Sequence, residues 1–352
     1  MNTLDRKKPV LVTGATGYLA SWIVKLLLDE GISVHATVRD KTKKEKYAHL
    51  LNIAKEGKGK LEIFEADLLK EGSFRDAMKD CELVIHSASP FQLYHIKDAE
   101  KELVDPALKG TRNVLNQVNQ TETVKRVVLT SSMVAIYGDS IDSRSAPGGI
   151  LTEQIWNTSS SPEHQPYSYS KMLAEKEAWK IVYEQHRWDL VVINPGFILG
   201  PSLDKNNAGF SNQFMTDLGK GKFRTGVPAG EIGVVDVRDA AKAHVLAGFT
   251  PTASGRHITA GYHISLAGIA KILKAKYPRL PLPGKPISKT LAWLVAPLLG
   301  MKRKYVKLNF NIDLKFDNSY VKKDLGLTFT PLEKTLEDHF EQLMNDGVIK
   351  RK

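Results

Sequence analysis

Short apolar runs alternate with amphipathic stretches along most of the chain. Residues 10–12 are apolar without interruption, which is typical of a strand buried on both faces of a parallel sheet. Apolar side chains then recur at helical spacing over residues 19–27, and Gly31 is a plausible helix stop. The same pattern predicts further strands at residues 33–38, 61–68, 82–86, 127–130, 190–193 and 256–259. The alternation of strands and helices indicates an α/β protein.

A glycine-containing turn joins the first predicted strand to the first helix. Residues 13–20 read TGATGYLA. Gly14 and Gly17 let the backbone turn tightly and approach a diphosphate, while the small Ala20 lets the helix pack against the strand. The helix N-terminus would then face the phosphates. Glycine turns also occur for purely steric reasons, so the turn alone leaves a ligand-free interpretation open.

The residues at the end of the second predicted strand indicate which dinucleotide, NAD(H) or NADP(H), the protein binds. In dinucleotide-binding folds this strand end lies beside the adenosine ribose, where an acidic residue binds the hydroxyls or an arginine accepts a 2′-phosphate. Arg39 occupies that position and Lys46 can add charge. Lys43 or Lys44 could add charge to the same pocket, but for each of them a solvated helix start is the better explanation. We therefore expect NADP(H) rather than NAD(H).

Two of these stretches resemble the extended short-chain dehydrogenase/reductases, and among them the dihydroflavonol reductase and cinnamoyl-CoA reductase group. They are residues 12–22, VTGATGYLASW, and residues 36–40, ATVRD. We expect a Rossmann-type doubly wound parallel sheet with a smaller, mostly C-terminal substrate lobe. The expected boundaries are 1–200 for the dinucleotide-binding domain, with a returning segment at about 232–258, and 201–231 with 259–352 for the substrate-binding lobe.

The next two strand ends supply further cofactor contacts. Asp67 and the Leu68 backbone amide are placed to bind an adenine amino group, a role that the family gives to this Asp, although Asp67 could instead cap the next turn. The small residues Ser87, Ala88 and Ser89 let the ribose and phosphate lie against the backbone, and with His86 they resemble the family's His-x-Ala-Ser/Thr-Pro. We interpret His86 as a hydrogen-bonded core residue.

Catalytic candidates follow the fifth strand. Ser131 and Ser132 reach the carboxyl edge of the sheet, where ligands bind in such folds, and either can hydrogen-bond a substrate carbonyl. Tyr167, unlike Tyr169, lies four residues before Lys171, which puts both side chains on one helix face. A phenol with a pKa near 10 needs a neighbouring cation to act at neutral pH, so we expect Lys171 to lower the pKa of Tyr167. The resemblance selects Ser132, because the family's catalytic serine is the second of its pair.

Residues 194–201, NPGFILGP, resemble the stretch that closes over the nicotinamide in the family. There Pro195 and Gly196 shape the backbone, and Phe197 or Ile198 flanks the ring. Asn113 is a candidate to steady the active site through a water. The catalytic prediction is Ser132, Tyr167 and Lys171, with no metal. The cofactor-binding prediction comprises Gly14, Thr16, Gly17, Tyr18, Leu19, Arg39, Lys46, Asp67, Leu68, Ser87, Ala88, Ser89, Tyr167, Lys171, Pro195, Gly196 and Ile198.

The charge balance and the cysteine count limit the classes of partner and the kinds of covalent cross-link that the protein can have. The net charge of +11 is compatible with nucleic acid, a membrane surface or an anionic substrate. The lysines are spread along the chain, and neither zinc-finger spacing nor an aromatic RNA-binding signature is present, so we expect no nucleic-acid partner. The single cysteine, Cys81, excludes an intramolecular disulfide. The polar N-terminus lacks the apolar core of a signal peptide, so we expect a cytoplasmic protein.

One apolar stretch, residues 290–301, precedes the basic tripeptide Lys302-Arg303-Lys304. It is too short to span a bilayer, and Pro297 interrupts it. We expect a lobe helix or a lid over the substrate pocket, with peripheral membrane contact as the alternative. A monomer and a homodimer both fit the sequence.

The expected activity is NADPH-dependent reduction of a small aldehyde or ketone, with the proton coming from Tyr167. Residues 165–171, QPYSYSK, depart from the Asn-Trp-Tyr-Cys-Tyr-Gly-Lys signature of cinnamoyl-CoA reductases, which argues against reduction of a CoA thioester. The alternatives are a nucleotide-sugar epimerase or dehydratase, a hydroxysteroid dehydrogenase, and a non-catalytic regulator that binds NADP(H).

Overall fold

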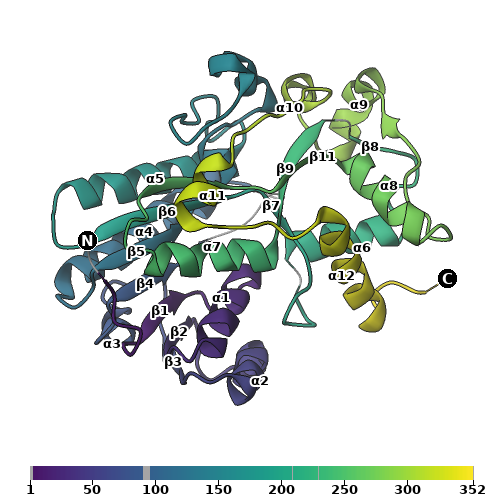
Figure 1. Ribbon diagram of the computed structural model, residues 1–352. Helices are drawn as coiled ribbons and strands as arrows, with labels where there is room; N and C mark the ends of the chain where they lie inside the picture. Colours follow the sequence, from purple (N-terminus) through teal and green to yellow (C-terminus); the bar gives the residue numbers. More distant parts are fainter. Residues whose placement is uncertain (1–2, 90–95, 208, 229, 352) are drawn as a thin grey trace.

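The centre of the computed structural model, which describes residues 3–89, 96–207, 209–228 and 230–351, is a seven-stranded parallel sheet (Figure 1). Its strands are β1 (Val10–Thr13), β2 (Val34–Val38), β3 (Leu61–Glu65), β4 (Leu83–His86), β5 (Arg126–Thr130), β6 (Asp189–Pro195) and β10 (Gly255–Thr259). Their order is β10-β6-β5-β4-β1-β2-β3. The order reverses between β1 and β4, which is where such folds bind ligands. The predicted Rossmann-type doubly wound sheet is confirmed.

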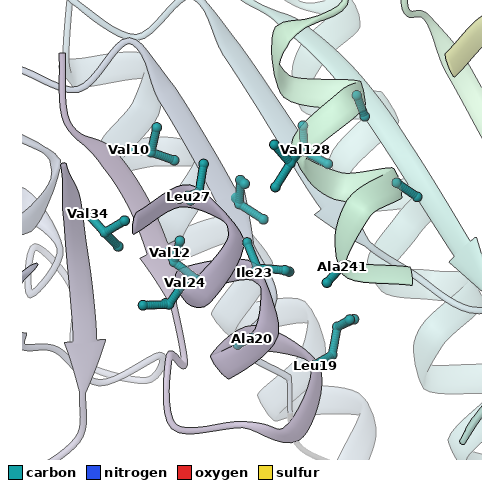
Figure 2. Close-up of a cluster of buried hydrophobic side chains, with 14 of the residues drawn as sticks. Val10, Val12, Leu19, Ala20, Ile23, Val24, Leu27, Val34, Val128 and Ala241 are labelled. Carbon is teal, nitrogen blue, oxygen red and sulfur yellow. The ribbon is translucent and has the colours of Figure 1, made fainter. Parts of the chain in front are cut away.

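Helices cover both faces of this sheet, and the apolar runs of the strands follow from that. Val10 and Val12 face a core shared with α1 (Tyr18–Asp29) and α7 (Val237–Phe249) (Figure 2). Leu11 faces the opposite core. The helices of that side are α3 (Arg75–Met78), α4 (Asp105–Gln120) and α5 (Pro166–Tyr183), while α2 (Ala48–Glu56) packs beside α1. Strands that are buried on both faces cannot alternate apolar with polar residues.

A second lobe is built around smaller sheets. Strands β7 (Phe197–Leu199), β9 (Glu231–Asp236) and β11 (Tyr262–Ser265) form one sheet, and β8 (Val227–Pro228) pairs with β12 (Pro286–Ile287). Helices α6 (Phe210–Gly219), α8 (Leu266–Lys276) and α12 (Leu332–Asn345) share an apolar core with the larger of these sheets. The segment expected to return to the first domain, residues 232–258, is therefore divided. Strand β9 belongs to the second lobe, whereas α7 packs on the main sheet and β10 is one of its strands.

The C-terminal tail also differs from the expectation that it builds the substrate lobe. Helix α11 (Ser319–Leu325) packs on β10 and α7. Val321, Leu325 and Leu327 are buried in the core that contains Val10. These apolar side chains close the face of the sheet beside its last strand, and the chain returns to the second lobe only with α12.

Two peripheral segments complete the structure. Residues 139–165 contain 3-10 turns at Ser140–Ser145 and Pro147–Gly149, and a buried contact of 2.6 Å between His164 Nε2 and Asp139 Oδ2 joins the two ends of this segment. The stretch at 290–301 forms α9 (Lys289–Val295) and a 3-10 turn, Ala296–Leu299, which lead to α10 (Arg303–Asn309). Within the described ranges, every helix is too short or too polar to cross a membrane.

Candidate active site

The glycine turn brings the carboxyl ends of β1 and β4 together. Gly14 has a φ of +64°, and a Cβ on it would lie 3.0 Å from both Cα and Cβ of Ala88. Thr13 Oγ1 accepts hydrogen bonds from the backbone N–H groups of Ser87 and Ala88 at 3.1 and 3.0 Å. Only glycine satisfies both the backbone conformation and the close approach. Three predicted cofactor residues, Gly14, Ser87 and Ala88, thus meet at one edge of the sheet.

The N-terminus of α1 follows this turn. Gly17 is the N-cap in an extended conformation, and among the residues that the structure describes no side chain caps the helix. The first N–H groups of a helix have no intrahelical acceptor, so this end can hold an anion. The Tyr18 hydroxyl donates to the carbonyl oxygen of Gly200, and Leu19 is buried. Of the predicted residues here, Tyr18 and Leu19 can therefore serve a cofactor through their backbone only.

Positive charge gathers after β2. Arg39 and Lys46 are exposed, and among the described residues neither enters an ion pair. Lys43 instead pairs with Asp40 at 3.0 Å. The Thr42 hydroxyl and Lys43 both bind the Asp40 carboxylate and lower its pKa to about 2. This separates Lys43 from Arg39 and Lys46, which remain available to a phosphate.

The loop after β3 carries Asp67. Its Oδ1 accepts the backbone N–H of Leu69 at 2.7 Å, which is the turn-capping alternative considered for this residue. Asn113 Nδ2 donates to the carbonyl oxygens of Leu68 and Lys70 at 3.0 and 2.8 Å. The Asn113 amide is therefore engaged by this loop rather than by the catalytic candidates.

Helix α5 carries both Tyr167, in its first turn, and Lys171. Lys171 is buried, and its Nζ donates to the carbonyl oxygen of Thr130 at 3.0 Å, at the end of β5. Burial lowers the pKa of Lys171 to about 8, and the Glu175 carboxylate opposes that shift. One hydrogen bond therefore ties the Tyr-Lys helix to the strand that delivers the two serines.

The pKa of Tyr167 differs from the expectation. Burial raises it well above its ordinary value. The lysine ammonium is instead directed to the end of β5, where it binds the carbonyl oxygen of Thr130. Tyr167 is thus a neutral phenol at neutral pH, which is the form that can donate a proton.

The adjacent serines have different environments. Ser131 is buried, and its hydroxyl donates to Glu175 Oε2. Ser132 is half-buried and caps the turn Met133–Ala135, where its Oγ accepts the Val134 N–H at 3.3 Å. Ser131 is therefore held by the interior, whereas Ser132 lies at the edge of the sheet.

Glu175 is at the centre of a buried polar network that was not predicted. Its carboxylate accepts hydrogen bonds from Arg256 Nε and from Asn194 Nδ2, the latter at 2.8 Å. Asn194 Nδ2 also binds the carbonyl oxygen of Ser132 at 3.1 Å. The Arg256 guanidinium lies 3.8 Å from the ring centroid of Trp156. Through Asn194, the network holds the backbone of Ser132 in place. The available signal was the position of Glu175, one helical turn beyond Lys171.

A small cavity between the sheet and helices α4 and α5 is lined by four of the predicted residues: Leu68, Ala88, Ser89 and Lys171. His86 also lines it. Its Nδ1 lies 2.8 Å from Thr13 Oγ1, and burial lowers the pKa of His86 to about 3. The interpretation of His86 as a hydrogen-bonded core residue is confirmed.

The segment expected to close over the nicotinamide links the two lobes. A Cβ on Gly196 would lie 2.5 Å from the carbonyl oxygen of Gly233, so the chain can pass there only with glycine. The Phe197 ring packs against Phe210 and Phe214 in the second lobe, at centroid distances of 5.6 and 5.5 Å. Ile198 packs against the core that contains Val10 and Val12.

Comparison with known proteins places these features in a wider group. Residues 10–261 match the model of the NAD dependent epimerase/dehydratase family. The chain is 38% identical over 351 residues to cinnamoyl-CoA reductase CAD2 of Medicago truncatula, covering 97% of this chain and 98% of that protein. It is 36% identical over 347 residues to tetraketide alpha-pyrone reductase 1 of Arabidopsis thaliana, covering 97% of each. The crystal structure of yeast methylglyoxal/isovaleraldehyde reductase Gre2 complexed with NADPH superposes with a TM-score of 0.79 at 28% identity, covering 97% of this chain and 100% of that one.

Proposed function

Because the chain belongs to the NAD dependent epimerase/dehydratase family, we propose that it reduces the carbonyl group of a small aldehyde or ketone to an alcohol with NADPH. It is an extended short-chain dehydrogenase/reductase of the dihydroflavonol reductase and cinnamoyl-CoA reductase-like group, as its motifs predicted, and an NADP-dependent oxidoreductase. The reaction and the substrate class are the proposal.

The residues at the turn fit the dinucleotide. A Cβ at Gly14 would meet Ala88, so the turn keeps its backbone open for a diphosphate at the N-terminus of α1. Arg39 and Lys46 supply positive charge for a 2′-phosphate. When bound there, NADPH supplies the hydride that the carbonyl carbon takes up.

The hydrogen bond from Lys171 Nζ to the carbonyl oxygen of Thr130 is the observation that carries the mechanism. It fixes the helix that bears Tyr167 against the strand end that bears Ser132. In the proposed reaction the Ser132 hydroxyl orients the substrate carbonyl, and Tyr167 Oη gives its proton to the carbonyl oxygen. Lys171 then stabilises the phenolate and binds the nicotinamide ribose.

A simple aldehyde or ketone is favoured over a CoA thioester. Residues 165–171 lack the signature of cinnamoyl-CoA reductases. In the second lobe, Phe197 of β7 packs against Phe210 and Phe214 of α6. The apolar character of this part of the lobe favours a compact apolar substrate.

The test is NADPH and NADH oxidation, followed by absorbance, against a panel of aromatic and aliphatic aldehydes and ketones. We expect Tyr167→Phe to lower turnover by about two to four orders of magnitude, because the proton donor is lost. NADPH affinity, measured by fluorescence titration, should stay unchanged. Tyr169→Phe, one half-turn along the same helix, is the matched control and should keep its rate.

A Tyr167→Phe enzyme with most of its activity would contradict the mechanism. An inactive wild-type protein that retains a nicotinamide dinucleotide through purification would instead favour the epimerase and dehydratase chemistry named in the family's description.

A further inference from the structure

Four large apolar side chains are exposed within eight residues of the α9 segment. They are Leu291, Trp293, Leu294 and Leu298, with exposed fractions of 50%, 40%, 55% and 86%. We call them the leucine patch. In Figure 1, α9 lies at the periphery of the second lobe. Its inner side has a core of its own, in which Ala292 and Ala296 pack on Val306 and Phe310. The patch is therefore the outer face of a packed hairpin.

The charge around this hairpin is distributed unevenly. Residues 240–312 contain twelve Lys and Arg and no Asp or Glu, so this stretch carries more than the whole net charge of +11, and the rest of the chain has a net charge of −1. Lysines occur throughout the sequence, but only here are they left without acidic residues along the chain. The positive charge of the protein is thus concentrated in the part of the chain that bears the leucine patch.

Some of these cations are used internally and others are not. Arg256 pairs with Glu175, and Lys276 pairs with Glu337. Lys302 Nζ donates to the carbonyl oxygen of Glu163. In contrast, Arg303, Lys304 and Lys307 are exposed on the arm of the hairpin that follows the patch.

Arg303 joins the charged and apolar parts of this surface. Its guanidinium lies 4.3 Å from the ring centroid of Trp293. Through this contact, the charged arm of the hairpin touches the leucine patch at Arg303.

This combination matches the chemistry of a membrane interface. Leucine side chains partition into the boundary between headgroups and acyl chains, tryptophan favours the headgroup level, and lysine and arginine bind anionic lipids. A second copy of this chain would bring the same excess of positive charge to the patch, and like charges oppose association. We propose that the α9–α10 hairpin docks on the surface of an anionic phospholipid bilayer. This inference is independent of the reductase chemistry.

Co-sedimentation with lipid vesicles tests the proposal. We expect the protein to bind vesicles that contain phosphatidylserine at least about tenfold more tightly than pure phosphatidylcholine vesicles, and high salt to weaken this binding. Leu294→Asp combined with Leu298→Asp should reduce affinity at least about tenfold, because two apolar side chains no longer enter the interface. Leu69→Asp is the matched control, since Leu69 is 59% exposed on the first lobe. It should bind like the wild type.

A second pair of variants tests the charge. Lys304→Gln should reduce affinity for anionic vesicles about fivefold, and the exposed Lys58→Gln on the first lobe should not. Unchanged thermal midpoints would show that all four variants fold. Absence of wild-type binding to anionic vesicles would overturn the proposal. Equal vesicle binding by the wild type and the Leu294→Asp, Leu298→Asp variant would also overturn it. So would a wild-type dimer in size-exclusion chromatography that these two substitutions convert to a monomer while vesicle binding persists.

Discussion

The hydroxyl of Ser131 donates a hydrogen bond to the buried carboxylate of Glu175, and this contact distinguishes Ser131 from its neighbour Ser132. Glu175 already accepts hydrogen bonds from Arg256 and Asn194. The carboxylate thus fixes Ser131 in the interior, while the next residue along the chain stays at the carboxyl edge of the sheet.

The two serines should respond differently to alanine substitution. We expect Ser132→Ala to lower kcat by about two to three orders of magnitude, in the range measured for the loss of an oriented donor. Its cost in the free energy of unfolding should be no more than about 1 kcal/mol, from the lost hydrogen bond to the Val134 N–H. Ser131→Ala should keep kcat within a few fold and cost about 1–3 kcal/mol in the free energy of unfolding, because a buried carboxylate loses a donor. Steady-state kinetics and urea denaturation separate the two effects. The reverse assignment of effects would move the catalytic role to Ser131.

The pH dependence should follow Lys171. Burial lowers the pKa of Lys171 to about 8, so in the proposed mechanism kcat/KM for carbonyl reduction should fall as pH rises through about 8 and the ammonium loses its proton. The Glu175 carboxylate acts against burial and raises the pKa of Lys171. Glu175→Gln should therefore move the alkaline limb of the profile to lower pH.

The control for this variant is Glu177→Gln on the same helix, whose carboxylate pairs with Arg112 at the surface. It should leave the profile unchanged. Because Glu175→Gln leaves Arg256 without its buried partner, we also expect a loss of about 3–5 kcal/mol in stability, so the profile should be measured well below the thermal midpoint. An alkaline limb that does not move would exclude Glu175 as a determinant of the Lys171 pKa.

Two glycines of similar φ allow the effect of a left-handed backbone to be measured separately from the effect of a close neighbouring residue. Gly14 has a φ of +64° and contacts Ala88, whereas Gly72 has a φ of +72°, and within the described part of the chain no atom beyond its two chain neighbours lies within 4 Å of the position that a Cβ would take. We expect Gly72→Ala to cost about 1–2 kcal/mol through its left-handed backbone alone. Gly14→Ala should cost more and should also weaken NADPH binding at least tenfold, as measured by calorimetry. Equal effects of the two substitutions on NADPH binding would contradict the proposed contact of the turn with the dinucleotide.

Cofactor preference should depend on Arg39. We expect Arg39→Ser to raise the KM for NADPH by about 10- to 100-fold, since a charge-assisted contact with the 2′-phosphate is worth about 1.5–3 kcal/mol. The KM for NADH should change little. Lys43→Ser should have a small effect on either cofactor, because the Lys43 ammonium is held by Asp40. If NADH and NADPH respond equally to Arg39→Ser, the 2′-phosphate is bound elsewhere.

The parts of the structure that follow from local pattern were predictable. Residues 10–12 are apolar because helices cover both faces of β1, and Gly14 is glycine because of its φ and the approach of Ala88. The four-residue spacing of Tyr167 and Lys171 places both on one helix. Each of these features leaves a recognisable signal within a few residues along the chain.

The remaining features depend on contacts between distant residues. Arg256 lies 81 residues from Glu175, and nothing near either residue indicates the other. The direction of Lys171 depends on the Thr130 carbonyl, which the sequence does not position. Helix α11 looks like any other short amphipathic segment, so its place beside β10 is set by which apolar face the completed sheet leaves open.

The returns of α7, β10 and α11 to the first lobe mean that neither lobe is a continuous piece of chain. A fragment that ends at residue 200 would lack the strand that pairs with β6 and the helix that packs on α1. Its exposed sheet edge would carry Val191 and Ile193, and such edges promote aggregation. Exchanging substrate lobes between relatives therefore requires grafting several separate segments at once, and a protease cut after β6 should release no independently folded half.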